Sequence, residues 1–292
     1  MRTWYKYITV PLKANDNNDV PPSQNDEEEF SRIEVLMGGY SAEQGYESRE
    51  VFFERYLAQE GVDRKSACDK FLRKHLNQNM HVLSVGSARA ANEMALIQDG
   101  FDITCSDLNV PDCVSATKNL FGNFTYETVN ILKKTNLVNF DAVITISTIY
   151  NFDLIQLDCC FDNIYQILNE DGILILDYAS APDNIWSYLY YDVFLQIDAW
   201  AYAVFRMIKD WRLYTVLKTF HGYRHANMEI ENAAISAGLE LYAYKEESIL
   251  INFQRGYLLP KLLGLKAVRS LLLSIGCKMP YVRLGAFQKG KQ

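Results

Sequence analysis

Residues 82–107 read VLSVGSARAANEMALIQDGFDITCSD, a stretch that combines a strand, a turn, a helix and a second strand in a recognisable order. Its apolar start predicts a strand that ends at Gly86, AANEMALIQDG predicts a helix, and FDITCSD predicts a second strand that ends at Asp107. A helix that begins just after a strand offers free backbone N–H groups to a ligand. An acid at the end of the neighbouring strand can accept hydrogen bonds from both hydroxyls of a ribose. The stretch therefore predicts a site for a ligand that contains adenosine.

The same alternation of strand and helix continues towards the C-terminus. Strands are predicted at 126–131, in FDAVITIST and in ILILDYA, with helices at 111–121 and 153–168 between them. Strands that alternate with helices are joined by right-handed crossovers and form a mostly parallel sheet. The continuous apolar run of FDAVITIST indicates that both faces of this sheet are covered. The residues therefore predict an α/β fold.

Well over half of the chain, chiefly residues 81–181, resembles the class I S-adenosylmethionine-dependent methyltransferases. VLSVGSARA stands where that family has an acid, an apolar residue and the pattern Gly-x-Gly-x-Gly. Gly86 matches the first glycine, whereas Ser84 stands in place of the acid. Ala88 and Ala90 replace the later glycines, and alanine resists a positive φ. The resemblance implies a Rossmann-like α/β sandwich, with a mostly parallel seven-stranded sheet and helices on both faces, and S-adenosyl-L-methionine as cofactor.

The resemblance also implies a set of site residues. Asp107 matches the ribose-binding acid of the family, and Leu108 beside it is placed to pack on the adenine. Ser147 and Tyr150 follow the fourth-strand motif and are expected near the methionine moiety or the methyl acceptor. The residues expected to bind the cofactor are Gly86, Ser87, Ala88, Asp107, Leu108, Asn130, Ser147 and Tyr40.

Several of these assignments have a structural alternative. Asn130 can accept a hydrogen bond from the adenine amino group, but it also suits a turn. Tyr40 lies ahead of a predicted helix and either folds over the cofactor or packs within the cap. His221, His225 and Tyr150 are the candidate general bases for an oxygen acceptor. For each of them, packing or a structural hydrogen bond is the alternative role.

The pattern along the chain suggests five segments. We expect a flexible N-terminal arm over 1–29, a helical cap over 30–77, a cofactor-binding core over 78–181, a helical insertion or lid over 182–220 after the fifth strand, and the C-terminal part of the core over 221–292. The aromatic insertion is the candidate acceptor pocket, with a dimer interface or simple core as the alternatives. Residues 255–278 mix leucine with cations and predict an amphipathic helix, which lies on an anionic membrane surface or packs on the domain.

The composition narrows the class of protein. A chain of 292 residues, of which 49% are hydrophobic, is long enough for a large core and unlike a disordered or fibrous protein. Its net charge is −7, yet all eight charged residues after Glu247 are cations, so only the end is basic and nucleic acid is not an expected partner. The six cysteines form no CxxC pair, which argues against a metal site. The sequence starts with no long apolar segment, which favours a cytoplasmic protein with reduced thiols.

The resemblance implies an enzyme that transfers a methyl group from S-adenosylmethionine to a small molecule, with oxygen favoured over nitrogen or carbon as the acceptor atom. Two other classes stay open. One is a catalytically silent binding or scaffold protein, which Ser84 and the missing glycines favour. The other is a methyltransferase that acts on a macromolecule or a lipid-like acceptor. A homodimer is also left open.

Overall fold

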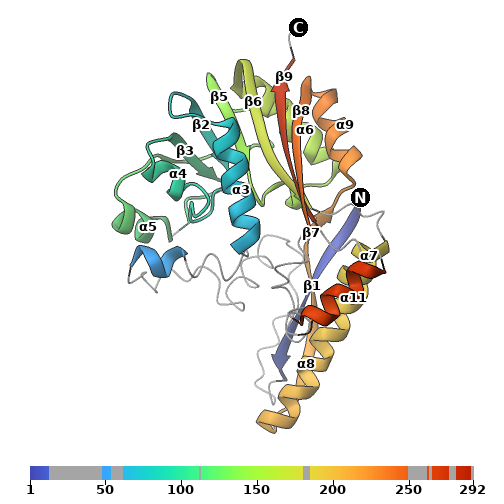
Figure 1. The fold of residues 1–292 in the computed structure, drawn as a ribbon. Helices are drawn as coiled ribbons and strands as arrows, with labels where there is room; N and C mark the ends of the chain where they lie inside the picture. The colour runs from blue at the N-terminus through green and yellow to red at the C-terminus, as the bar shows by residue number, and fades with distance from the viewer. Residues whose placement is uncertain are drawn as a thin grey trace.

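The computed structural model describes residues 1–12, 48–53, 62–111, 113–179, 185–248, 262, 265–275 and 281–290. Its centre is a seven-stranded sheet in the order β4-β3-β2-β5-β6-β9-β8 (Figure 1). The strands are β2 His81–Val85, β3 Asp102–Asp107, β4 Tyr126–Thr128, β5 Phe140–Thr145, β6 Leu168–Ala179, β8 Leu239–Ser248 and β9 Tyr281–Lys289. Neighbours from β4 to β6 run parallel, whereas β9 is antiparallel to β6 and β8. The predicted α/β fold with a mostly parallel seven-stranded sheet is confirmed.

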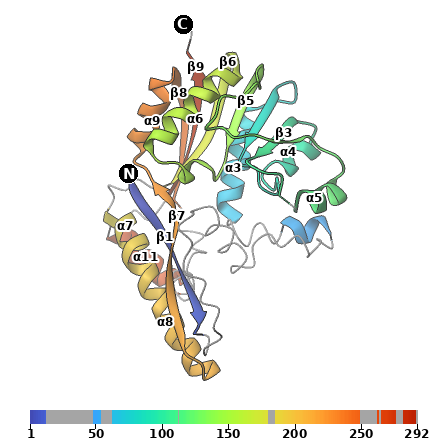
Figure 2. The same ribbon diagram turned by 180° about the vertical axis from the view of Figure 1, so that it is seen from behind.

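Helices cover both faces of this sheet, because successive side chains of a strand point to opposite sides. Val82 and Ile144 pack with α3 and α4 on one face, whereas Leu83 and Val143 pack with α6 and α9 on the other. Figures 1 and 2 show the two faces from opposite sides. The helices of the sheet domain are α3 Val62–His75, α4 Met94–Gln98, α5 Cys113–Phe121, α6 Leu154–Ile167 and α9 Asn227–Ser236, with a 3₁₀ turn η1 at Ile149–Asn151.

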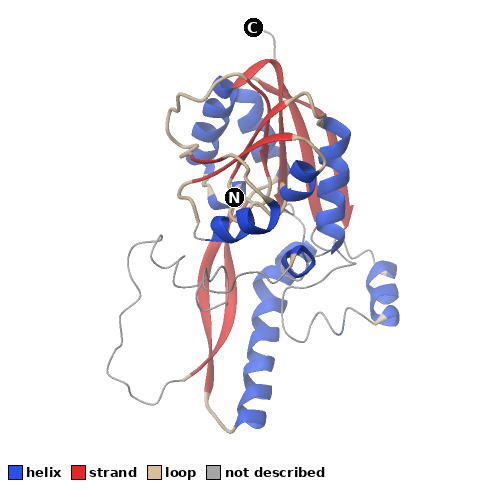
Figure 3. Ribbon diagram, turned by 90° about the vertical axis from the view of Figure 1, so that its left-hand side faces the viewer, coloured by secondary structure: helices blue, strands red, loops and turns tan. Residues whose placement is uncertain are grey.

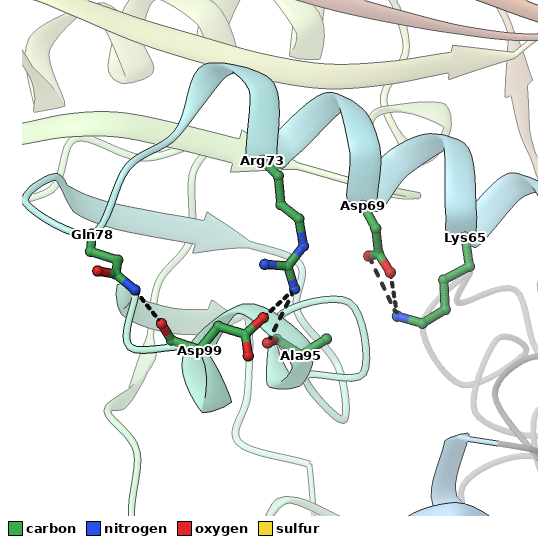
Figure 4. Close-up of polar contacts among 6 residues, drawn as sticks. All are labelled: Lys65, Asp69, Arg73, Gln78, Ala95 and Asp99. Carbon is green, nitrogen blue, oxygen red and sulfur yellow. Dashed lines mark hydrogen bonds and ion pairs between the residues drawn. The ribbon is translucent and has the colours of Figure 1, made fainter.

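Polar contacts fix α3 to the segment that follows β2 (Figure 4). Arg73 forms an ion pair of 2.6 Å with Asp99, and its guanidinium donates to the carbonyl oxygen of Ala95 at 3.4 Å. The side-chain amide of Gln78 donates to the carbonyl oxygen of Asp99. Exposed ion pairs contribute only about 0–1 kcal/mol. The buried apolar side chains of α3 therefore contribute most of the stability, and these contacts set its register.

The first residues form a strand, not a flexible arm. β1 (Arg2–Pro11) pairs antiparallel with β7 (Tyr214–Arg224) along its whole length, in a ribbon separate from the main sheet. The prediction of a flexible segment over 1–29 is therefore wrong for 2–11, and residues 13–29 lie outside the described part. The prediction of a helical insertion up to residue 220 is wrong from Tyr214 onwards. The partners Lys6 and Thr219 are 213 residues apart, so neither strand's local sequence reveals the pairing.

The helices of the insertion pack on this ribbon. They are α7 Ile185–Tyr188, the π-helix η2 Leu189–Phe194 and α8 Leu195–Asp210. Trp4 of β1 is buried against Tyr190, Tyr191 and Leu195, and Thr9 donates to a carbonyl of α8. Figure 3 shows the ribbon and α8 projecting together from the sheet domain. We call residues 1–12 and 185–224 the arm.

The basic segment at 255–278 is described only at 262 and 265–275. There α11 (Lys266–Ser274) lies beside the arm, with Val268 and Leu272 against its apolar cluster (Figure 1). No helix in the described ranges is both long and apolar enough to span a membrane.

Candidate functional site

The candidate site lies where the carboxyl ends of four parallel strands meet. β2 is central, with β3 and β4 on one side and β5 and β6 on the other, so the order of the strands reverses at this point. Ligands of open α/β sheets bind in the crevice at such a switch point. Gly86 follows β2, Asp107 ends β3, Ser147 follows β5 and Asp177 is near the end of β6. The topology therefore brings these four residues to one edge.

Gly86 is required by a close contact within the protein. Its φ is +75°, and a Cβ built on it would lie 2.2 Å from the hydroxyl oxygen of Thr148. That hydroxyl donates to the carbonyl oxygen of Val85 at 3.0 Å. The loop after β5 therefore packs directly on the turn after β2, which only glycine permits. Thr148 therefore fills the space that a side chain at position 86 would need.

Ala88 and Ala90 hold the left-handed conformation that glycine usually provides. Their φ angles are 45° and 61°. A left-handed backbone costs an L-residue about 1–2 kcal/mol, and such strain persists where the surroundings fix it. The amide of Ala88 donates to the Asp107 carboxylate at 3.0 Å, and its carbonyl accepts from the hydroxyl of Tyr126 at 2.7 Å. The amide of Ala90 donates to the carbonyl of Ser87 at 2.6 Å. The loop thus keeps a glycine-like shape without the glycines.

Asp107 joins this loop to the end of β3. One carboxylate oxygen accepts from the amide of Ala88 and the other from the amide of Leu108, at 3.0 and 2.7 Å. Burial raises the pKa of Asp107, and the two backbone donors oppose that rise. The side chain is only half-buried, and an ionised carboxylate has about four lone-pair positions. Asp107 can therefore accept further hydrogen bonds from a ligand, beside the exposed side chain of Leu108.

Beneath the loop lies a buried polar cluster that sequence reasoning missed. Ser84, which stands in place of the family's acid, donates its hydroxyl to Glu93, and Glu93 is buried. The other carboxylate oxygen of Glu93, Oε2, has no hydrogen-bond partner in the described part of the chain. Ser87 and Ser106 both donate their hydroxyls to the carbonyl of Ser84, at 3.1 and 2.8 Å. The hydroxyl of Ser87 thus points inward, so that its backbone is the part of Ser87 left to meet the cofactor.

Glu93 is a carboxylate held under strong desolvation. Burial raises its pKa, while the hydroxyl of Ser84 and the positive charge of Lys65 on α3 lower it. Lys65 is itself buried and pairs with Asp69 at 3.4 Å. The sequence did contain a signal for Glu93. Ser84 stands where the family has an acid, and Glu93 is an acid nine residues further along the chain. Only the fold shows that the two side chains meet.

The loop after β5 adds a second acid to the edge. Ser147 has a φ of 60°, and its amide donates to the carboxylate of Asp177 at 2.6 Å. Asp177 is buried on β6, which the sequence analysis did not single out. Ser147 is half-buried in the loop that follows β5. Asn130 follows β4 at the same edge, but its side-chain oxygen accepts from the amide of Leu132 at 3.0 Å, which is the turn role.

The two candidate catalytic residues lie together. The rings of Tyr150 and His221 have centroids 5.1 Å apart, and His221 also contacts Trp4 at 4.3 Å. Gly222 packs so closely on Tyr150 that a Cβ would lie 2.4 Å from the Tyr150 carbonyl oxygen. Tyr150 lies three residues beyond Ser147, and β7 brings His221 against it. The sequence placed His221 in the C-terminal part of the core, which is wrong for residues 221–224, because β7 pairs with β1 in the separate ribbon and sets His221 against Trp4.

The other predicted residues separate from this group. His225 is buried, and its Nε2 is hydrogen-bonded to the carbonyl of Phe152 at 2.8 Å. Burial lowers the pKa of His225, which favours its neutral form, and the hydrogen bond to Phe152 gives the ring a structural role. Tyr40 lies outside the described residues. Within the described ranges, no group of three metal-ligating side chains comes together.

Comparison with solved structures identifies the fold. A SAM-dependent methyltransferase from Methanosarcina mazei has 12% identity, covers 76% of this chain and 98% of its own, and has a TM-score of 0.53. The 1,6-didemethyltoxoflavin-N1-methyltransferase of Burkholderia thailandensis, with bound S-adenosylhomocysteine, has 11% identity, covers 97% and 95%, and scores 0.52. The magnesium protoporphyrin IX methyltransferase of Synechocystis PCC 6803, with bound SAH, has 13% identity, covers 91% and 95%, and scores 0.51. The sequence matches no protein-family model and no curated protein. The chain thus has the fold of these methyltransferases.

Proposed function

We propose that this chain is an S-adenosylmethionine-dependent methyltransferase that acts on a small-molecule acceptor. The turn after β2 carries the proposal, because its strained Ala88 is hydrogen-bonded to the carboxylate of Asp107. This contact sets a narrow loop and an acid side by side at the switch point, as an adenosine ligand requires. Two solved structures with this fold contain S-adenosylhomocysteine, the product of the cofactor after methyl transfer.

The residues at the edge fit this cofactor. Asp107 would accept hydrogen bonds from the ribose hydroxyls, and Leu108, whose side chain is 52% exposed, would pack on the adenine. Asp177 lies at the end of β6 beside the Ser147 loop, and its carboxylate suits the methionine ammonium. Glu93 has an oxygen without a hydrogen-bond partner in the described part and supports the loop from below. Asp107 and Asp177 would thus supply the carboxylates that Ser84 does not.

The chain's own residues would position the acceptor and manage its proton. When bound, the cofactor supplies a methyl group already activated on sulfur, so placement and exclusion of water matter most. An acceptor hydroxyl must lose its proton, and His221 beside Tyr150 is the group suited to take it. The aromatic surroundings of His221 exclude water and suit an apolar acceptor. This pairing supports the proposal that the methyl group goes to oxygen.

Titration calorimetry with S-adenosylhomocysteine tests the proposal. We expect micromolar affinity for the full chain and at least tenfold weaker binding for Asp107→Ala, since a hydrogen bond to a charged group contributes about 1.5–3 kcal/mol. Asp102→Ala is the matched control, because Asp102 lies at the other end of the same strand and should not affect binding. A folded protein that binds no S-adenosylhomocysteine would refute the cofactor assignment and favour the scaffold alternative.

A further inference from the structure

The outward face of α8 is apolar along its whole length. Its inward face packs small or aliphatic side chains, Leu195, Ala199 and Ala203, on the ribbon. The outward residues are large and exposed, namely Phe194, Ile197, Trp200, Val204, Phe205 and Ile208. A soluble monomer rarely exposes so continuous an apolar surface, and such surfaces usually contact a partner or a membrane. Figure 1 shows that α8 lies on the projecting arm, away from the main sheet.

Trp211 caps the outer end of this helix in an unusual way. Its φ is 52°, the left-handed conformation that glycine usually takes after a helix, and its side chain is 93% exposed. An exposed side chain adds little to stability, while a left-handed backbone is unfavourable for a residue of this size. Leu213 beside it is also exposed. Trp211 therefore presents a large amphipathic ring at the tip of the arm.

The charges of the arm complement an anionic surface. The arm carries seven Lys and Arg against three Asp, whereas the rest of the chain carries 22 against 33 Asp and Glu. All three carboxylates are engaged or buried, because Asp192 pairs with Arg224, Asp210 pairs with Arg206, and Asp198 is buried. The exposed cations therefore find no acid on the arm of a second copy within the described residues, and anionic lipid is the complementary partner.

We propose that the arm docks on an anionic lipid bilayer, with the outward face of α8 lying in the interface and Trp211 inserted at headgroup level. Amphipathic helices with aromatic and aliphatic side chains on one face bind membranes in this way. Tryptophan favours the interface because its ring is apolar and its N–H is polar. Lys209 and Arg212 flank Trp211 in the sequence and are exposed, so they can contact lipid phosphates.

Vesicle sedimentation of the full chain tests this docking. We expect binding to phosphatidylcholine vesicles that contain phosphatidylserine, and at least tenfold weaker partition for the double variant Ile208→Ser, Trp211→Ser. Replacing Lys209 and Arg212 by Gln should reduce the partition by about tenfold or more, and only on vesicles with anionic lipid. Ile155→Ser is the matched control, since Ile155 is 76% exposed on α6 of the sheet domain and should not affect binding.

Tryptophan fluorescence gives a second measurement. Anionic vesicles should shift the wild-type emission to the blue, because Trp200 and Trp211 both enter the interface. Trp211→Phe should keep the binding but lose a part of that shift. Equal partition of wild type and the Ile208/Trp211 variant would overturn the proposal. A second result would also overturn it. If light scattering shows that the wild type is a dimer and the variant a monomer, and neither binds vesicles, the face contacts a second copy and not a membrane.

Discussion

Replacing Ala88 by glycine should stabilise the protein. Ala88 is only half-buried and has a φ of 45°, so the substitution removes backbone strain and little buried surface. Release of the left-handed strain contributes about 1–2 kcal/mol. The greater freedom of glycine in the unfolded chain costs about 0.4–1 kcal/mol. The gain minus the loss spans about 0–1.6 kcal/mol, so the free energy of unfolding should rise by about 0.8 kcal/mol, the middle of that net range.

Two other alanines serve as comparisons. Ala90 has a φ of 61° but is fully buried, so Ala90→Gly also loses a buried methyl group, worth about 0.8 kcal/mol, and should be nearly neutral. Ala95 lies inside α4, where glycine should destabilise by about 0.5–1 kcal/mol. Urea unfolding with an unchanged m-value would measure all three. If Ala88→Gly destabilises as much as Ala95→Gly, the turn is not strained and the proposed loop geometry is wrong.

Two further substitutions test the buried acid and the candidate base. Glu93→Gln keeps an oxygen that accepts from Ser84 but removes a buried charge. Because burial raises the native pKa above its ordinary value of 4.5, wild-type stability falls as pH rises from 4.5 through the native pKa. The advantage of the variant in urea unfolding should therefore grow towards neutral pH, and a constant difference would contradict the buried charge. His221→Ala should lower methyl transfer by about 10²-fold or more and leave S-adenosylhomocysteine affinity unchanged, whereas equal turnover would exclude a base at this position.

The sequence predicted the elements whose signals are local. FDAVITIST became β5 because its apolar run is buried between helices on both faces, and the spacing from Gly86 to Asp107 placed an acid at the end of β3. The ribbon was missed because β1 and β7 stabilise each other although most of the sequence separates them, so neither strand has a partner nearby in the chain. The pairing of Ser84 with Glu93 was missed for a related reason. Helical periodicity tells which residues face the core, but not which buried polar group meets another.

Asn130 shows the limit of reasoning from family motifs. Its position after β4 agrees with the expected edge of the sheet, yet its oxygen accepts from the amide of Leu132. An asparagine that follows a strand can use its side chain in two ways, to hydrogen-bond the backbone of the local turn or to hydrogen-bond a ligand. The turn lies two residues away in sequence, so it is satisfied as soon as the chain folds. A role at the adenine would have to use the remaining lone pair or the amide N–H groups.

A single strand carries both His221 and the outer end of the arm. β7 begins at Tyr214, and His221 lies seven residues further on, about 24 Å away at the usual rise of a strand. If α8 lies flat on a bilayer, the ribbon on which it packs lies one layer behind it. His221 would then be held just above the lipid headgroups, with Tyr150 and Trp4 around it. An acceptor that projects its hydroxyl from the headgroup region is within reach of that position. Docking of the arm would therefore favour the lipid-like alternative, and amphiphilic molecules are the first acceptors to screen.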